Sequence, residues 1–122
     1  MTLPPGVPSI DPVEAERRLR QGDPDGRTPI LVDVRNLDEF IEARVPGATF
    51  IPLPEFAARF RELPTDRPLF MLCRSGSRSA AATVHLLGNG HAEVSNVTGG
   101  ILGWARAGLP VVQGPLQPGE GR

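Results

Sequence analysis

The sequence predicts a single α/β domain built on a central, mainly parallel sheet. Two features indicate this class. Short apolar runs, of which residues 30–34 are rich in β-branched side chains, alternate with segments that have the periodicity or composition of helices, which is the pattern of parallel strands joined by crossover helices. The connections are short, so right-handed crossovers are expected. A chain of 122 residues with 39% hydrophobic residues can bury one ordinary core.

The first elements are marked by capping residues. Residues 9–10 are expected to form a short strand or an extended lead-in. Asp11 has the features of a helix N-cap, because Pro12 follows at the first helical position and Glu14 stands at the third. This helix is expected to stop at Gly22.

The apolar run over residues 30–34 predicts a buried strand, and a short helix over 36–43 follows it. The apolar stripe of that helix is expected to consist of Leu37, Phe40 and Ile41. The remaining elements are expected, in order, as strand 48–51, amphipathic helix 55–63, strand 68–72, helix 80–87, strand 93–97 and helix 101–107.

Glycine and proline, at 14 residues each, are concentrated at both ends of the chain. This distribution predicts a flexible segment over residues 1–8 and a flexible tail over 113–122, around a folded domain of residues 9–112. The first twelve residues lack the basic start and the apolar run of a signal peptide. No apolar run approaches the roughly 20 residues that cross a bilayer.

Charge and cysteine content exclude several functions. The formal net charge is −1 with acids and bases mixed, so no basic field is available for a nucleic-acid backbone or an anionic membrane. The one cysteine, Cys73, can form neither an internal disulfide nor a multi-cysteine zinc site, and no metal is expected. A lone thiol favours a reducing compartment, so we expect a cytoplasmic protein.

Cys73 directly follows the predicted strand 68–72, at the end of a strand where ligands of such folds usually bind. The residues that separate it from the next helix are Arg74, Ser75, Gly76, Ser77, Arg78 and Ser79. Free N–H groups at a helix N-terminus, a flexible glycine and two arginines all stabilise a thiolate. We therefore expect a depressed pKa and a nucleophilic role for Cys73. The alternative of an inert core cysteine does not explain this loop.

The pattern Cys-x-x-Gly-x-Arg-Ser between a strand and a helix resembles the active-site loop of the rhodaneses, the thiosulfate sulfurtransferases. Three further segments resemble signatures of that family in the same order: Asp33-Val34-Arg35 with Glu39-Phe40, Pro46-Gly47-Ala48 with Ile51-Pro52, and Gly99-Gly100 with Trp104 and Gly108-Leu109-Pro110-Val111. The resemblance extends from about residue 9 to residue 112. It implies a rhodanese-like fold with helices on both faces of the sheet.

The resemblance also implies a two-step sulfur transfer. Cys73 would take a sulfane sulfur from thiosulfate or a related anionic donor and become a persulfide. Residues 74–79 would bind the substrate, with backbone amides and serine hydroxyls around the outer sulfur and with Arg74 and Arg78 orienting the donor. Cyanide or a thiol acceptor (glutathione, thioredoxin or a sulfur-carrier protein) would then remove the sulfur, and no cofactor is implied.

One position departs from the family pattern. Many relatives have a histidine just before the hydrophobic residue that precedes Pro-Gly-Ala, and this chain has Arg44 there. Arg44 is kept as a candidate modulator of the site. Asp33 and Arg35 are candidates for a supporting role, with a structural ion pair or hydrogen-bond network as the favoured interpretation. His91 is expected to be exposed.

Two other functions stay open at this point. A rhodanese-like module could bind partners or sense persulfides without efficient turnover, although such modules often lack the cysteine. A cysteine phosphatase or arsenate reductase would also use a cysteine loop with an arginine. Four residues separate Cys73 from Arg78, however, one fewer than in the phosphatase loop, so this loop suits a smaller sulfur species than phosphate.

Overall fold

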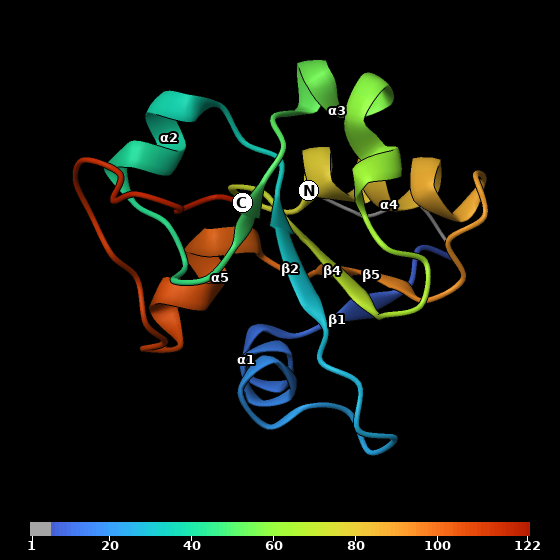
Figure 1. Cartoon of the computed structure of the whole chain (residues 1–122). Helices are drawn as coiled ribbons and strands as arrows, with labels where there is room; N and C mark the ends of the chain where they lie inside the picture. Colours follow the sequence, from blue (N-terminus) through green and yellow to red (C-terminus); the bar gives the residue numbers. More distant parts are fainter. Residues whose placement is uncertain (1–5) are drawn as a thin grey trace.

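The computed structural model describes residues 6–122 and contains one five-stranded sheet (Figure 1). The strand order is β1-β5-β4-β2-β3, and every pairing of these strands is parallel. The strands are β1 Ser9–Ile10, β2 Ile30–Asp33, β3 Thr49–Phe50, β4 Leu69–Leu72 and β5 Val94–Val97. The predicted α/β class with a parallel central sheet is confirmed. The carboxyl ends of the strands therefore meet at one edge of the sheet.

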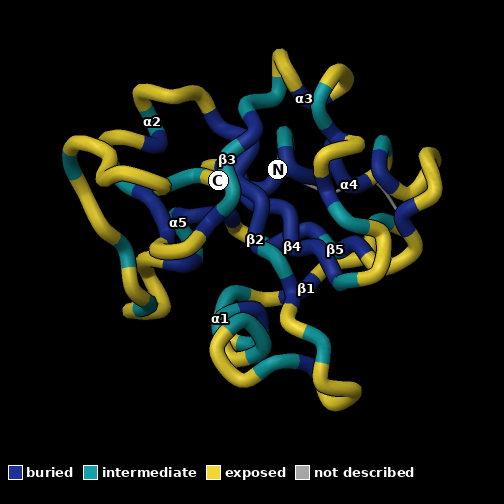
Figure 2. The backbone as a smooth tube through the Cα atoms, viewed as in Figure 1, coloured by how far each residue is buried: buried dark blue, intermediate teal, exposed yellow. Residues whose placement is uncertain are grey.

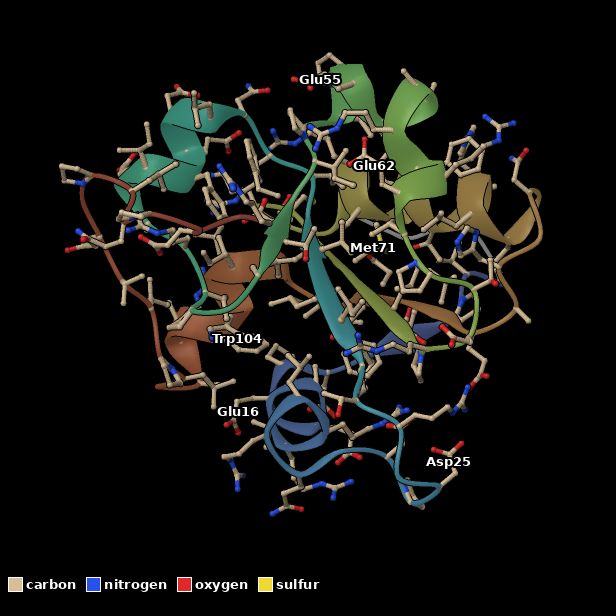
Figure 3. The ribbon with its side chains drawn as sticks, in the orientation of Figure 1. Glu16, Asp25, Glu55, Glu62, Met71 and Trp104 are labelled. Atoms are coloured by element: carbon tan, nitrogen blue, oxygen red, sulfur yellow. The ribbon has the colours of Figure 1, made fainter. Side chains whose placement is uncertain are left out.

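Helices cover both faces of this sheet, as expected (Figure 1). The helical elements are α1 Pro12–Gln21, α2 Leu37–Glu42, α3 Leu53–Arg59, η1 Phe60–Glu62, α4 Ser77–Leu87 and α5 Gly100–Arg106. Helices α1 and α5 pack together on one face, and α3 and α4 pack together on the other. Trp104 of α5, labelled in Figure 3, is buried on the first of these faces.

Strand β4 is buried on both sides because each face of the sheet is covered (Figure 2). Its side chains alternate between two apolar clusters. Leu69 and Met71 pack with α3, η1 and α4, whereas Phe70 and Leu72 pack with α1 and α5. Cys73 continues this alternation and lies in the same cluster as Met71, at the end of the central strand.

Two expectations about the helices need correction. Helix α4 begins at Ser77, three residues before the expected start, because Gly76 takes a positive φ of 112° and becomes the N-cap. Ser77, Arg78 and Ser79 thus form the first turn of the helix. Of the predicted apolar stripe, α2 buries Phe40 alone, since Leu37 and Ile41 are 51% and 36% exposed, so the stripe does not pack as a unit.

The two ends of the domain pair with the sheet. Residues 1–5 of the expected flexible segment lie outside the described residues, and the carbonyl of Pro8 accepts a hydrogen bond from the Asn96 N–H. The expected tail 113–122 returns to β3, where the Phe50 N–H donates to the Gly121 carbonyl at 2.8 Å. How freely these segments move stays a prediction. Among residues 6–122, no helix has the length and apolarity to cross a membrane.

Candidate active site

The candidate site lies where β4 ends and α4 begins. Figure 3 labels Met71, two residues before Cys73 on this strand. Cys73 is fully buried, and the short turn Arg74–Gly76 joins it to the first turn of α4. Gly76 can take the left-handed backbone conformation that this turn requires, which side chains with a Cβ resist. The turn therefore places the N-terminus of α4 directly beside the sulfur.

Several hydrogen-bond donors converge on the thiol. The Gly76 N–H donates to Cys73 Sγ at 3.1 Å, and the Ser79 hydroxyl lies 3.2 Å from the same atom. Burial raises the pKa of the Cys73 thiol. The hydroxyl and N–H of Ser79, together with the N–H groups of Gly76 and Ser75, outweigh that effect and hold the pKa below its ordinary value. The loop therefore favours a thiolate.

Helix α5 fixes the other side of the turn through its N-terminal amides. The Ile101 N–H donates to the Cys73 carbonyl at 2.9 Å, and the Leu102 N–H donates to the Arg74 carbonyl at 3.2 Å. Gly100 makes this approach possible, because a Cβ there would lie 2.5 Å from the Cys73 carbonyl oxygen. These bonds hold the Cys73 and Arg74 carbonyls toward α5, while the N–H groups of Ser75, Gly76 and Ser79 act on the sulfur.

Asn96 is a buried polar residue that the sequence analysis did not single out. It is fully buried on β5, with Oδ1 2.5 Å from Ser79 Oγ and Nδ2 3.2 Å from the Gly76 carbonyl oxygen. A signal was available in the sequence, since an asparagine inside an apolar strand needs hydrogen-bond partners. Both of its partners are residues that donate to the sulfur.

The two arginines of the loop differ in their surroundings. The Arg78 guanidinium donates two hydrogen bonds to the Glu39 carboxylate, at 2.7 and 2.9 Å. This contact lowers the pKa of Glu39 from its ordinary 4.5 to about 2 and raises the pKa of Arg78. Arg74, by contrast, is exposed. The carboxylate of Glu39 therefore partly neutralises the positive charge of Arg78. The sequence did not predict this contact, although Glu39 belongs to one of the motifs named above.

The remaining serines of the loop lie at its outer side. Ser75 is exposed and contributes its backbone N–H to the thiol's surroundings. Ser77 is half-buried at the start of α4. The structure thus brings Gly76 and Ser79 into direct hydrogen-bond contact with the sulfur, while the side chains of Ser75 and Ser77 lie farther out in the loop.

Asp33 and Arg35 form a buried ion pair at the end of β2. Arg35 Nη2 lies 2.7 Å from an Asp33 carboxylate oxygen, and both side chains are almost completely buried. The same guanidinium donates to the carbonyl oxygens of Glu39 and Ala43. These contacts connect β2 to α2 and so hold Glu39 in place, in agreement with the structural role favoured for this pair.

Arg44 is buried and contacts the C-terminal segment. Its guanidinium donates to the Glu120 carboxylate at 2.6 and 2.8 Å and to the Gly114 carbonyl at 2.7 Å. It also stacks over the Phe40 ring of α2. Arg44 therefore joins α2 to the segment after residue 112, and its role as a modulator of the thiol stays a prediction.

His91 corrects a further expectation. Its side chain is buried, not exposed, and its ring lies edge-on to Phe60. Nε2 lies 3.4 Å from the Leu63 carbonyl oxygen. His91 is therefore a packing residue against η1.

Comparison with known proteins identifies a family match over most of the chain. Residues 11–107 match the model of the rhodanese-like domain. A protein named sulfurtransferase from Allochromatium vinosum is 38% identical over 106 residues, which cover 87% of this chain and 95% of that protein. Thiosulfate sulfurtransferase GlpE of Pseudomonas syringae is 32% identical over 95 residues, covering 78% of this chain and 84% of that protein.

A solved structure shows the same fold. The crystal structure of a rhodanese-related protein from Thermoplasma volcanium superposes with a TM-score of 0.74 at 28% identity. The superposition covers 86% of this chain and 97% of that one. The family match over residues 11–107 includes the strand, the loop and the helix that surround Cys73.

Proposed function

Because this chain belongs to the rhodanese-like domain family, we propose that it is a sulfurtransferase that carries sulfane sulfur on Cys73. The observation that carries the proposal is the convergence of Gly76 N–H and Ser79 hydroxyl on the Cys73 sulfur. Such an arrangement stabilises a thiolate nucleophile, and it would serve a bound anionic sulfur as well. Thiosulfate is the proposed donor, by the family resemblance.

In the first step, the Cys73 thiolate attacks the outer sulfur of thiosulfate. A bond forms between Sγ and that sulfur, the sulfur–sulfur bond of thiosulfate breaks, and sulfite leaves with the bonding electron pair. The negative charge of the enzyme moves from Sγ to the outer sulfur of the new persulfide. No proton needs to be transferred, because nucleophile and leaving group are both anions.

The loop supplies donors for the charge in its new position. The N–H groups of Ser75, Gly76 and Ser79 act on the sulfur at the N-terminus of α4, an eleven-residue helix. Arg74 is exposed and would attract the dianionic donor, while Arg78 supplies charge held in place by Glu39. Fixed donors of this kind stabilise an anion without having to reorganise during the reaction.

In the second step, a nucleophilic acceptor removes the outer sulfur. Cyanide would become thiocyanate, and a thiolate would become a persulfide; in both cases Cys73 returns as a thiolate. The two displacements predict ping-pong kinetics. Glutathione, thioredoxin and a sulfur-carrier protein are the proposed classes of physiological acceptor. The reducing cytoplasm, our proposed location, would keep the thiol available.

Mass spectrometry of the intact protein after thiosulfate treatment tests the proposal. We expect an adduct of about 32 Da, one sulfur atom, on the wild type and no adduct on the variant Cys73→Ser. Addition of cyanide should remove the adduct and release thiocyanate. No adduct with thiosulfate or with several other sulfane donors would contradict the proposal.

Two further measurements separate the alternative functions, one on the persulfide form of the protein and one with an aryl phosphate. A stable persulfide that neither cyanide nor any thiol removes would favour a persulfide-sensing module. Hydrolysis of an aryl phosphate that depends on Cys73 would favour a phosphatase.

A further inference from the structure

The side chain of Asn96 contacts two of the residues that donate hydrogen bonds to the Cys73 sulfur, Ser79 and Gly76. Its Oδ1 lies 2.5 Å from the Ser79 hydroxyl, and its Nδ2 donates to the Gly76 carbonyl at 3.2 Å. The carbonyl can only accept, which orients the amide with Nδ2 toward Gly76 and Oδ1 toward Ser79. A fully buried amide on β5 thus reaches across to the turn before α4.

The Ser79 hydroxyl has one proton and two neighbours that can accept it. Oδ1 of Asn96 is an acceptor only, and a thiolate at Cys73 is an acceptor as well. At 2.5 Å, the two oxygens of Ser79 and Asn96 repel each other unless the proton lies between them. The Sγ atom lies 3.2 Å away on the other side of the same hydroxyl. One proton cannot serve both acceptors at once.

We propose that Asn96 is a positioning residue that controls the direction of the Ser79 hydroxyl and thereby favours the uncharged form of the Cys73 Sγ atom. When Cys73 is a thiol, its S–H donates a hydrogen bond to Ser79 Oγ, and the Ser79 hydroxyl donates its own hydrogen bond to Asn96 Oδ1. When Cys73 is a thiolate, the hydroxyl turns its proton to Sγ, and Oδ1 loses its donor. Asn96 therefore opposes the thiolate through Ser79.

This control has a consequence for sulfur transfer, which rests on the function proposed above. When Sγ bonds to the donor's outer sulfur and sulfite leaves, the negative charge moves to the outer sulfur. The inner Sγ is then uncharged, and the Ser79 hydroxyl can again donate its hydrogen bond to Asn96 Oδ1. Asn96 thus stabilises the persulfide relative to the free thiolate and favours retention of the sulfur until an acceptor arrives.

The remaining contacts of the loop do not depend on Asn96. The Gly76 carbonyl also accepts from the Ala80 N–H at 3.1 Å, and the Cys73 carbonyl is held by α5. The ionisable side chains on the surrounding elements are Arg74 in the turn, Arg78 and His85 on α4, Asp33 and Arg35 at the end of β2, Asp38, Glu39 and Glu42 on α2, and Arg106 at the far end of α5. None of the substitutions that test this proposal, at Asn96, Ser79 and Thr83, changes any of them.

Titration of the thiolate absorbance in the ultraviolet tests the proposal on protein without donor. The chain has one cysteine and no tyrosine, so no tyrosinate overlaps the signal. Asn96→Leu replaces the amide with an apolar group of similar size. We expect it to lower the Cys73 pKa, with roughly three- to tenfold more thiolate relative to thiol below the wild-type pKa.

The variant Ser79→Ala tests whether Asn96 acts on the Cys73 pKa through the Ser79 hydroxyl. Ser79→Ala alone should raise the Cys73 pKa, because it removes a donor to the sulfur. In the Ser79→Ala background, Asn96→Leu should change the pKa no further, because the hydroxyl that transmits its effect is absent. If Asn96→Leu does not fold, Asn96→Ala makes the same comparison.

Thr83→Val is the matched control. It removes another buried hydroxyl, one that donates to the Ser79 backbone carbonyl at 2.8 Å, and it should leave the Cys73 pKa unchanged. An unchanged or raised pKa in Asn96→Leu overturns the proposal, as does an equal shift with and without Ser79. The titration requires no sulfur transfer, so a failure of the proposed function would not be mistaken for a failure of this one.

Discussion

The guanidinium of Arg78 is bound by the carboxylate of Glu39 through two hydrogen bonds of 2.7 and 2.9 Å. This contact joins the first turn of α4 to α2 through two residues that are 39 positions apart in the sequence. Because of this ion pair, the positive charge of Arg78 that an anionic sulfur donor would encounter is partly neutralised by Glu39. The strength of donor binding should therefore depend on Glu39.

The variant Glu39→Gln should bind anionic donors more tightly. It removes the negative charge, and its amide oxygen can still accept from the Asn36 N–H at the start of α2. We expect the KM for thiosulfate to fall about two- to fivefold at low salt, because a partly exposed ion pair contributes up to about 1 kcal/mol, and the gain should shrink as salt is added.

Steady-state kinetics at several ionic strengths measures this effect. Glu55→Gln is the matched control, because Glu55 (Figure 3) pairs with Arg59 on α3 and carries the same charge. A KM for Glu39→Gln equal to that of the control at every salt concentration would contradict the prediction.

Glu39 should also make stability depend on pH in the acid range. Its pKa falls from an ordinary 4.5 to about 2 in the folded protein, because Arg78 hydrogen-bonds its carboxylate. A depressed pKa means that the unfolded chain binds the proton more readily, so this contribution is present above about pH 4.5 and is lost as the pH falls toward 2.

Denaturant unfolding of the wild type and Glu39→Gln over that pH range measures the contribution. We expect the two free energies of unfolding to differ most near neutral pH and to converge as the pH approaches 2. A constant difference across the range would show that the carboxylate does not titrate as described.

Gly100→Ala should disturb the loop around Cys73. The new Cβ would lie 2.5 Å from the Cys73 carbonyl oxygen, and Gly100 has a positive φ of 59°. We expect a loss of about 2 kcal/mol or more in stability and a higher Cys73 pKa, because the loop must move away from α5.

Gly108→Ala is the control for the backbone conformation alone. Its φ is 75°, and no atom lies within 4 Å of the position that the Cβ would take. This variant should lose about 1 kcal/mol with no change in the Cys73 pKa, as measured by denaturant unfolding and thiolate titration. Equal effects of the two substitutions would argue against the close approach at Gly100.

Glu120→Gln should destabilise the domain although it lies near the end of the chain. It leaves the buried guanidinium of Arg44 without its carboxylate partner. We expect a lower Tm than for Glu16→Gln, which breaks an exposed pair on α1. Thermal unfolding followed by circular dichroism compares the two variants; equal Tm values would mean that the tail contributes little.

Local patterns were sufficient for the order of elements and for the nucleophile. The apolar run over residues 68–72 predicts a strand, which the structure has over Leu69–Leu72, and Cys73 follows it directly. Asp11 and Pro12 predict the start of α1, where the Asp11 side chain accepts from the Glu14 N–H at 2.9 Å. These signals depend on residues that are neighbours in the sequence, so they can be read without knowledge of the fold.

Contacts between distant segments could not be predicted in the same way. Nothing in the sequence near Arg78 indicates Glu39, and nothing near Arg44 indicates Glu120. The exposure of Leu37 and Ile41 depends on the angle at which α2 meets the sheet, which a short helix does not reveal. The burial of His91 likewise depends on where η1 crosses it.

By itself, the sequence determined the α/β class, the position of Cys73 at the end of a strand, and the glycine and small residues that let a helix begin beside it. The tertiary structure decided which groups act on the sulfur and on the arginines. A hydrogen bond to Sγ requires a donor placed within about 3 Å of it. The contacts that α5, Asn96 of β5 and Glu39 of α2 make with the loop form only when the parallel sheet brings its strand ends together.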